Sequence, residues 1–166
     1  MPHTTQVSTV SDTEILIARR FEAPRRLVFD CLKEPEYVRQ WMLGPEGWTM
    51  PVCTIDFRTG GKYRYVWENR DGRRMGMGGT YKEIVAPERI VATELFDEDW
   101  TGGETTNTTT LAERSSVTTL EIRVKYASKQ ARDGALATGM TEGMEAGFQR
   151  LERVLAGMEA NAGGAR

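Results

Sequence analysis

The sequence predicts an α+β domain in which a curved antiparallel sheet of about seven strands packs around one long C-terminal helix. Between residues 50 and 126, short segments rich in β-branched and aromatic residues follow one another at hairpin spacing, separated by turn residues. After residue 128, apolar side chains recur at intervals of three or four, which is the helical period. Because no other long element remains, this helix can bury its apolar side only against the sheet.

Two short helices are expected after the first strand. Residues 14–21 predict that strand, since apolar and polar side chains alternate along much of it. Pro24 suits the first turn of a helix, and Pro35 ends that helix and begins a second one. The glycines and proline of residues 44–47 end the second helix. The remaining strands are expected at residues 50–58, 62–69, 74–85, 89–97, 104–112 and 117–126.

Residues 56–67 are the most informative stretch of the chain. Gly60 and Gly61 predict a turn between two strands. In the second of these strands, the period of two places aromatic side chains on one face and charged side chains on the other. The aromatic face consists of Tyr63, Tyr65 and Trp67, and the charged face of Lys62, Arg64 and Glu68. Such an aromatic row either fills a core or lines a pocket.

The long helix is expected to begin after Ser128, a suitable N-cap, and to continue to about Gly157. Its apolar stripe consists of Leu136, Met140, Met144, Phe148, Leu151, Leu155 and Met158. Gly139, Gly143 and Gly147 recur beside this stripe, although a glycine costs about 1 kcal/mol relative to alanine in a helix interior. Either close packing of the helix on the sheet or space left for a ligand would explain these glycines.

Length and charge limit the broad class of protein. The 166 residues predict one domain over residues 13–158, between a disordered lead at 1–12 and a flexible tail at 159–166. A net charge of −2 without a basic run argues against a nucleic-acid partner. No stretch is apolar enough to span a membrane, and the polar lead does not resemble a signal peptide. We therefore expect a cytoplasmic location.

Several kinds of chemistry lack the residues that they need. The one histidine, His3, lies in the lead, so a hydrolase triad or a multi-histidine metal site is not expected. Cys31 and Cys53 lack the spacing of a zinc or redox pair and are interpreted as buried free thiols. No phosphate-binding loop is found. The sequence therefore predicts neither a metal nor a bound cofactor, and no catalytic residue beyond a weak candidate, Glu94.

Glu94 shares its strand parity with Ile90, Ala92 and Phe96. If this face points inward, Glu94 is a carboxyl group in an apolar cavity with a raised pKa, able to act as a general acid or to receive a polar group of a ligand. If the other face points inward, Glu94 is solvated. Alternation alone leaves both orientations open, with the solvated one slightly favoured.

A pocket between sheet and helix is the most useful functional hypothesis from the residue pattern. Methionines and aromatic residues suit an adaptable apolar wall, and apolar pockets with few polar groups are the usual form of small-molecule sites. The candidate ligand-binding residues are Trp41, Tyr63, Tyr65, Trp67, Met75, Met77, Tyr81, Glu94, Phe96, Gly139, Met140, Gly143 and Met144.

Trp100 lies in an acidic, glycine-containing segment, residues 97–103, that predicts a loop. An exposed tryptophan there would cap the mouth of a pocket or contact a protein partner. Alternatively, its side chain folds back onto the sheet.

The Asp-x-Arg-x-Gly-Gly hairpin at residues 56–61 resembles the signature of the activator of heat-shock-chaperone ATPase homologue family, within the START-like (SRPBCC) superfamily. The same family places a tryptophan and a Gly-Pro pair at the end of two short helices, where this chain has Trp41 and Gly44-Pro45. The resemblance covers roughly residues 13 to 157, in order.

The resemblance implies a helix-grip (START-like) fold whose members enclose a hydrophobic ligand between sheet and long helix. On this basis we expect a carrier or sensor of a small, largely apolar molecule. The resemblance also implies two alternatives. One is a co-chaperone-like protein that interacts with the heat-shock chaperone ATPase. The other is a cyclase- or aromatase-like enzyme that uses Glu94 in the pocket.

Overall fold

The computed structural model describes residues 3–98 and 102–164, and side chains up to residue 160. Its strands form one antiparallel sheet in the order β1-β2-β8-β7-β6-β5-β4-β3. The strands are β1 (Gln6–Thr9), β2 (Glu14–Phe21), β3 (Thr49–Ile55), β4 (Lys62–Glu68), β5 (Arg74–Val85), β6 (Arg89–Phe96), β7 (Thr105–Arg114) and β8 (Val117–Lys125). The antiparallel sheet, the short N-terminal helices and the long C-terminal helix confirm the predicted fold class.

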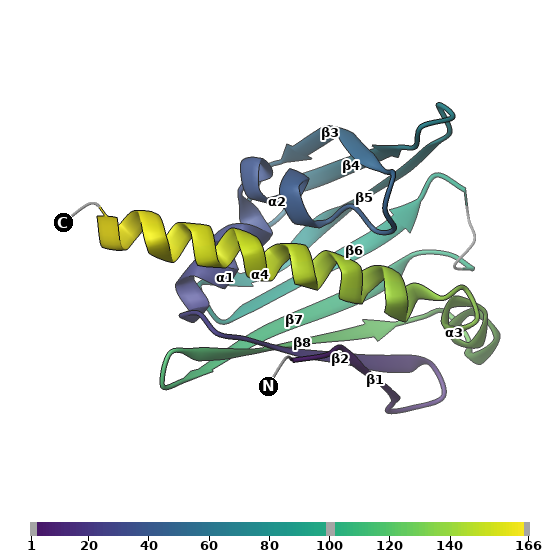
Figure 1. Ribbon diagram of the computed structural model, residues 1–166. Coiled ribbons are helices and arrows are strands. Elements are labelled where there is room, and N and C mark those ends of the chain that lie inside the picture. Colours follow the sequence, from purple (N-terminus) through teal and green to yellow (C-terminus); the bar gives the residue numbers. More distant parts are fainter. Residues whose placement is uncertain (1–2, 99–101, 165–166) are drawn as a thin grey trace.

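The two short helices follow β2, as predicted. They are α1 (Arg25–Lys33) and α2 (Pro35–Trp41), with Pro24 as the N-cap of the first and Pro35 at the start of the second. A proline fits there because the first turn of a helix leaves its backbone N–H groups without intrahelical partners. The pair lies on the same side of the sheet as the C-terminal helix (Figure 1).

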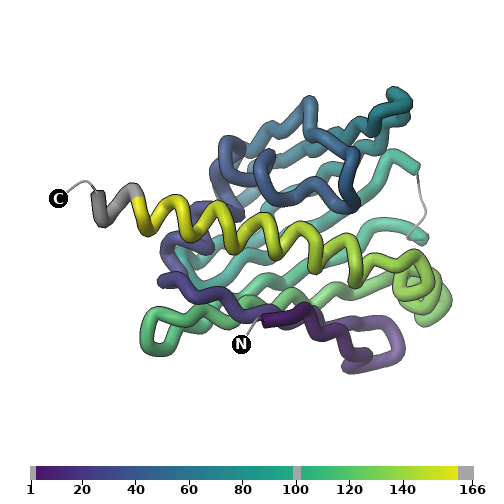
Figure 2. Tube along the Cα trace, in the orientation of Figure 1, coloured from purple at the N-terminus to yellow at the C-terminus, as the bar shows by residue number. Residues whose placement is uncertain are grey.

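The C-terminal helix α4 (Met140–Gly164) crosses one face of the sheet (Figures 1 and 2). Its buried side chains include Phe148, Leu151 and Leu155, each 3% exposed or less. The Phe148 ring meets the Phe21 ring edge-on at 5.6 Å and stacks on the Trp41 ring at 5.9 Å. The helix is therefore held against both the sheet and α2. None of the described helices is long and apolar enough to cross a membrane.

The sequence predicted one helix from residue 128, whereas the structure has α3 (Lys129–Leu136) before α4. Ser128 caps α3 as predicted, because its side chain accepts a hydrogen bond from the Ala131 N–H. The helix is interrupted at Gly139, whose φ of +78° is a left-handed conformation that favours glycine. A helical apolar stripe can continue across such a break, so the stripe did not reveal it.

Strand β1 lies within residues 1–12, where the sequence predicted a disordered lead. Strand β1 pairs with β2, with Val7 opposite Ile17, and adds an edge strand to the seven that were expected. Most of its residues are polar and exposed, so the segment carries almost no alternation. The backbone of α4 likewise continues into the predicted flexible tail, 159–166, as far as Gly164.

Candidate functional site

A cavity of about 520 Å³ lies between the sheet and α4. The sheet, together with Tyr126 directly after β8, contributes Ile17, Tyr63, Tyr65, Trp67, Met75, Met77, Tyr81, Ile90, Ala92, Glu94, Phe96, Asn107, Thr109, Leu120, Ile122 and Val124. The helices and the segment after α2 contribute Leu32, Trp41, Met42, Leu43, Gly44, Pro45, Trp48, Met140, Gly143, Met144, Gly147 and Phe148. The cavity is therefore bounded by all the strands from β4 to β8, by β2 and by three helices.

The aromatic row of β4 forms one wall of this cavity. Tyr63, Tyr65 and Trp67 are buried, each 8% exposed or less, and neighbouring rings lie 5.1 Å and 5.9 Å apart. Strand pairing places Met77 opposite Tyr65 and Met75 opposite Trp67. The wall therefore combines rigid aromatic rings with flexible methionine side chains, which adapt to irregular apolar shapes.

The polar atoms of this wall are largely satisfied within the protein. The Tyr63 hydroxyl donates to the Thr93 carbonyl oxygen at 2.6 Å. The indole N–H of Trp67 donates to the Met42 carbonyl at 2.7 Å, and that of Trp41 donates to a backbone carbonyl of α1 at 2.8 Å. Because these donors are occupied, the three side chains present mainly ring carbon to the cavity.

Gly79 makes room for the Tyr63 hydrogen bond. It lies opposite Tyr63 in the β4–β5 pairing. A Cβ atom at this position would overlap the Thr93 carbonyl oxygen and lie 2.8 Å from the Tyr63 hydroxyl. A glycine is therefore required where the tyrosine reaches across β5 to β6.

Glu94 lines the cavity, which settles the orientation that alternation left open. Its strand neighbours Ala92 and Phe96 line the cavity with it, whereas Leu95 is 45% exposed on the other face. Asn107 Nδ2 donates to Glu94 Oε2 at 2.8 Å. Burial raises the pKa of the Glu94 carboxyl, and the hydrogen bond from Asn107 offsets part of that rise. The solvated orientation, slightly favoured from the sequence, was wrong.

Tyr126 brings a hydroxyl to the same part of the cavity. Burial, together with the charge of Glu94, raises the pKa of Tyr126 to about 12. Its hydroxyl lies 4.0 Å from the sulfur of Met140 on α4. Glu94, Asn107 and Tyr126 are thus a small polar group in a lining that is otherwise mostly apolar.

The three glycines of the predicted stripe differ in what surrounds them. Gly139 lies outside the cavity lining and allows the turn between α3 and α4. A Cβ on Gly147 would lie 3.1 Å from the Trp41 carbonyl oxygen, so this glycine serves close packing against α2. A Cβ on Gly143 would meet nothing nearer than Pro45, at 4.0 Å, and Gly143 lines the cavity. Close packing therefore accounts for Gly147, whereas Gly143 borders open space.

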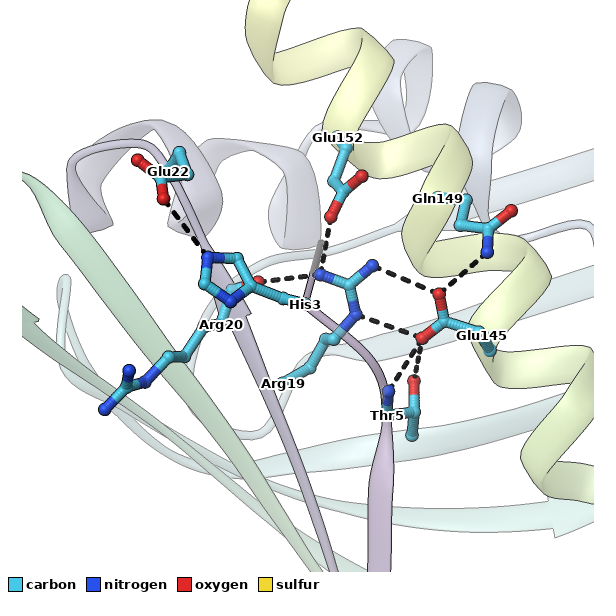
Figure 3. Close-up of polar contacts among 8 residues, drawn as sticks. All are labelled: His3, Thr5, Arg19, Arg20, Glu22, Glu145, Gln149 and Glu152. Carbon is cyan, nitrogen blue, oxygen red and sulfur yellow. Dashed lines mark hydrogen bonds and ion pairs between the residues drawn. The ribbon is translucent and has the colours of Figure 1, made fainter. Parts of the chain in front are cut away.

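A buried arginine joins β2 to α4 (Figure 3). The Arg19 side chain is 0% exposed and forms ion pairs with Glu145 at 3.1 Å and with Glu152 at 2.6 Å. Thr5 donates to Glu145 through both its backbone N–H and its hydroxyl, each at 2.7 Å. Burial alone would raise the pKa of the Glu145 carboxyl, but the hydrogen bonds from Arg19 and Thr5 outweigh it and lower that pKa to about 2. This group of side chains fixes α4 over the sheet.

The remaining reactive side chains do not form a catalytic group in the described structure. Cys31 and Cys53 are free and buried, as predicted. Burial raises the pKa of the Cys31 thiol to about 12 and also raises that of Cys53, so neither is a ready nucleophile. His3 contacts Glu22 at 3.2 Å. Among the described residues, no group of three or more His, Cys, Asp or Glu side chains could hold a metal ion.

Comparison with known proteins shows the family. The family described as activator of Hsp90 ATPase homolog 1-like protein matches residues 22–156. The chain belongs to this family. The resemblance inferred from the hairpin at residues 56–61 is thereby confirmed. No curated protein matches the chain.

Several solved structures are similar to this member of the activator of Hsp90 ATPase homolog 1-like family. A protein from Rhodobacter sphaeroides is 32% identical, with a TM-score of 0.88 over 93% of this chain and 99% of that chain. Protein NE0264 from Nitrosomonas europaea is 22% identical, with a TM-score of 0.80 over 92% of this chain and 99% of that chain. The AHSA1-like protein from Aeromonas hydrophila is 15% identical, with a TM-score of 0.67 over 84% of this chain and 93% of that chain. The last two likenesses show the fold alone.

In this family member, the structure gathers all the candidate ligand-binding residues except Gly139 around one cavity. Sequence reasoning missed the lining residues of β7 and β8, including Asn107, and the segment from Met42 to Trp48. The parity of Leu120, Ile122 and Val124 on β8 was an available signal. No sequence signal pointed to Asn107, because it lies in a run of threonines, and their composition does not show which face of the strand points inward. Trp100 lies outside the described residues.

Proposed function

We propose that this protein binds a small, largely apolar molecule in the cavity under α4 and acts as its carrier or sensor. The observation that carries the proposal is the cavity itself, because about 520 Å³ between sheet and helix is left unfilled by the protein's own side chains. Small-molecule sites are typically apolar clefts or cavities of roughly 300–1,000 Å³ with a few polar groups. Protein interiors otherwise contain few voids larger than a water molecule.

The character of the lining supports an apolar ligand. Aromatic rings and methionines dominate the walls, and the indole N–H groups of Trp41 and Trp67 already have backbone partners. A ligand that offered many polar groups would lose its hydrogen bonds to water without replacing them. An apolar ligand is stabilised by about 25 cal/mol for each Å² of its surface that is removed from water.

The surroundings of the cavity support a site formed before the ligand arrives. Arg19, Glu145 and Glu152 fasten α4 to β2, and the Arg150 guanidinium donates to the Gly44 carbonyl at 2.7 Å. These contacts hold α4 and the segment after α2 in place, and both line the cavity. A preformed site avoids much of the cost of ordering side chains upon binding.

Native mass spectrometry of the protein purified gently from its own cells tests the proposal. We expect extra mass that disappears on denaturation, in the wild type and in Gly157→Leu. Gly157 is exposed on the same helix, and a Cβ there would meet nothing within 4 Å. Gly143→Leu places a side chain in the cavity and should lose the extra mass while the domain stays folded. Equal extra mass in all three proteins would contradict the proposed site.

A cyclase- or aromatase-like enzyme is a second candidate function, favoured by the inward position of Glu94. A general acid needs a pKa near the working pH, and burial raises the pKa of this carboxyl. Carbon-13 NMR titration of the Glu94 carboxyl tests this candidate. A titration at the ordinary pKa of glutamate would remove its main support.

A co-chaperone role is a third candidate, because the matching family is described as activator of Hsp90 ATPase homolog 1-like. It predicts a direct complex with the heat-shock chaperone of the same organism. A pull-down with purified chaperone measures this complex, and the absence of binding would count strongly against the role.

A further inference from the structure

We propose that the ligand of this cavity is a cationic amphiphile, an amine whose ammonium group lies against Glu94 while its apolar part occupies the aromatic side of the cavity. This inference rests on the proposed function and specifies the chemical class of the ligand. It follows from the charges that surround the cavity and from the hydrogen bonds that Glu94 makes.

The described cavity lining carries one acidic side chain and no basic one. Glu94 is the acid, and none of the lining residues in the described parts of the chain is Lys, Arg or His. The carboxylate is deep in the protein, yet part of the residue's surface stays accessible because it borders the cavity. A ligand in the cavity therefore meets a site that is negative or neutral.

The buried arginines near this side of the sheet are engaged elsewhere. Arg19 pairs with Glu145 and Glu152 on α4. Arg132 is 8% exposed, and its guanidinium contacts Asp133 and the Ser11 carbonyl oxygen. Neither arginine lines the cavity. The protein thus neutralises two buried cations locally and leaves Glu94 without a cationic partner among the described residues.

Glu94 has capacity for a further donor. Within the described structure, Asn107 is the one side chain that donates to it, to Oε2 at 2.8 Å. An ionised carboxylate accepts several hydrogen bonds, and an ammonium group supplies three donors. A charge-assisted hydrogen bond is roughly twice as strong as a neutral one. An ammonium group would satisfy the remaining acceptor positions of Glu94.

The aromatic lining favours the same sign of charge. The rings of Tyr63 and Tyr126 belong to the lining, and burial, together with the nearby charge of Glu94, raises the pKa of both hydroxyl groups. Aromatic faces are electron-rich and attract a cation within about 6 Å of the ring centre. A carboxylate ligand would instead meet both the like charge of Glu94 and these negative ring faces.

Competition among three ligands of equal chain length tests the inference. The neutral fluorescent probe N-phenyl-1-naphthylamine is first bound to the protein at pH 7, and then displaced by decylammonium, decanol or decanoate. We expect decylammonium to displace it at a concentration at least ~10-fold below those of the other two. Decanol is the more hydrophobic competitor, so this order cannot arise from the hydrophobic effect. Equal or better displacement by decanol or decanoate would overturn the inference.

Two variants assign the preference to Glu94. Glu94→Gln removes the charge and keeps an amide that can bond to Asn107, so the preference for the amine should be lost while the probe still binds. Glu121→Gln removes the same charge from the outer face of β8, between the cavity-lining residues Leu120 and Ile122, and should keep the preference. A preference that survives in Glu94→Gln would overturn the inference. Failure of the wild type to bind the probe would instead overturn the proposed function, and with it the inference.

Discussion

The guanidinium of Arg19 donates to both carboxylate oxygens of Glu145, from Nε to Oε1 at 3.1 Å and from Nη2 to Oε2 at 3.2 Å (Figure 3). This bidentate ion pair links β2 to α4. Thr5 of the N-terminal segment also donates two hydrogen bonds to the Glu145 carboxylate. Glu145 on α4 therefore binds both the segment before β2, through Thr5, and the buried guanidinium of Arg19.

Arg19→Met should destabilise the protein. Removing one partner of a buried pair leaves the other partly buried charges uncompensated, and we expect a loss of about 3 kcal/mol in the free energy of unfolding. Urea unfolding followed by circular dichroism measures it. Arg58→Met is the matched control, because Arg58 and Asp56 form an exposed pair and such pairs contribute about 0–1 kcal/mol. Equal losses in the two variants would contradict the structural role of Arg19.

The stabilisation that Glu145 provides should depend on pH. Its pKa is lowered in the folded protein from 4.5 to about 2, so the folded state binds its proton less readily than the unfolded state. The contribution is present above pH 4.5 and is lost as the pH falls toward 2. The stability difference between wild type and Glu145→Gln should therefore be largest above this window and close within it. Urea titrations at several pH values measure the difference, and a constant gap would contradict the assignment.

Alanine substitutions should distinguish the glycines of α4. Gly143→Ala adds a methyl group that meets nothing nearer than 4.0 Å, so the helix propensity of alanine should raise the free energy of unfolding by about 0.5–1 kcal/mol. Gly147→Ala adds one that lies 3.1 Å from the Trp41 carbonyl oxygen, so part or all of that gain should be lost. Thermal unfolding of both variants measures the order. A more stable Gly147→Ala would show that the contact with α2 is loose.

The two thiols should resist modification in the folded protein. Cys31 and Cys53 are 0% and 5% exposed, and burial raises the pKa of both, that of Cys31 to about 12. Because the thiolate is the reactive form, a disulfide reagent at pH 8 should react slowly until the protein unfolds. Absorbance measurements with and without urea compare the rates. Rapid reaction in the absence of urea would contradict the burial of these side chains.

Local patterns predicted the fold because each element carries its own signal. Hairpin spacing, turn residues, β-branched and aromatic content and, in places, alternation predicted the strands from β2 to β8, and the helical period predicted α4. Strand β1 was missed because a short polar edge strand alternates too weakly. The break at Gly139 was missed because the sequence does not reveal whether a glycine adopts a left-handed conformation.

The sequence predicted most of the residue types that line the cavity, but not which face of strand β6 points into it. Leu95 and Phe96 are both apolar, so alternation could not show that Phe96 and Glu94 line the cavity while Leu95 faces solvent. Arg19 shares its parity with the buried Ile17, which was a visible sign of an inward charge. Its partners on α4 are distant in sequence, and only the packing of the helix brings them together.

The most direct test of the central claim is a fluorescence titration of N-phenyl-1-naphthylamine into three proteins: wild type, Gly143→Leu and Gly157→Leu. The account predicts saturable binding by the wild type and by Gly157→Leu, and loss of binding by a folded Gly143→Leu. Equal binding by all three proteins, or no saturable binding by the wild type, would contradict a ligand site in the cavity under α4.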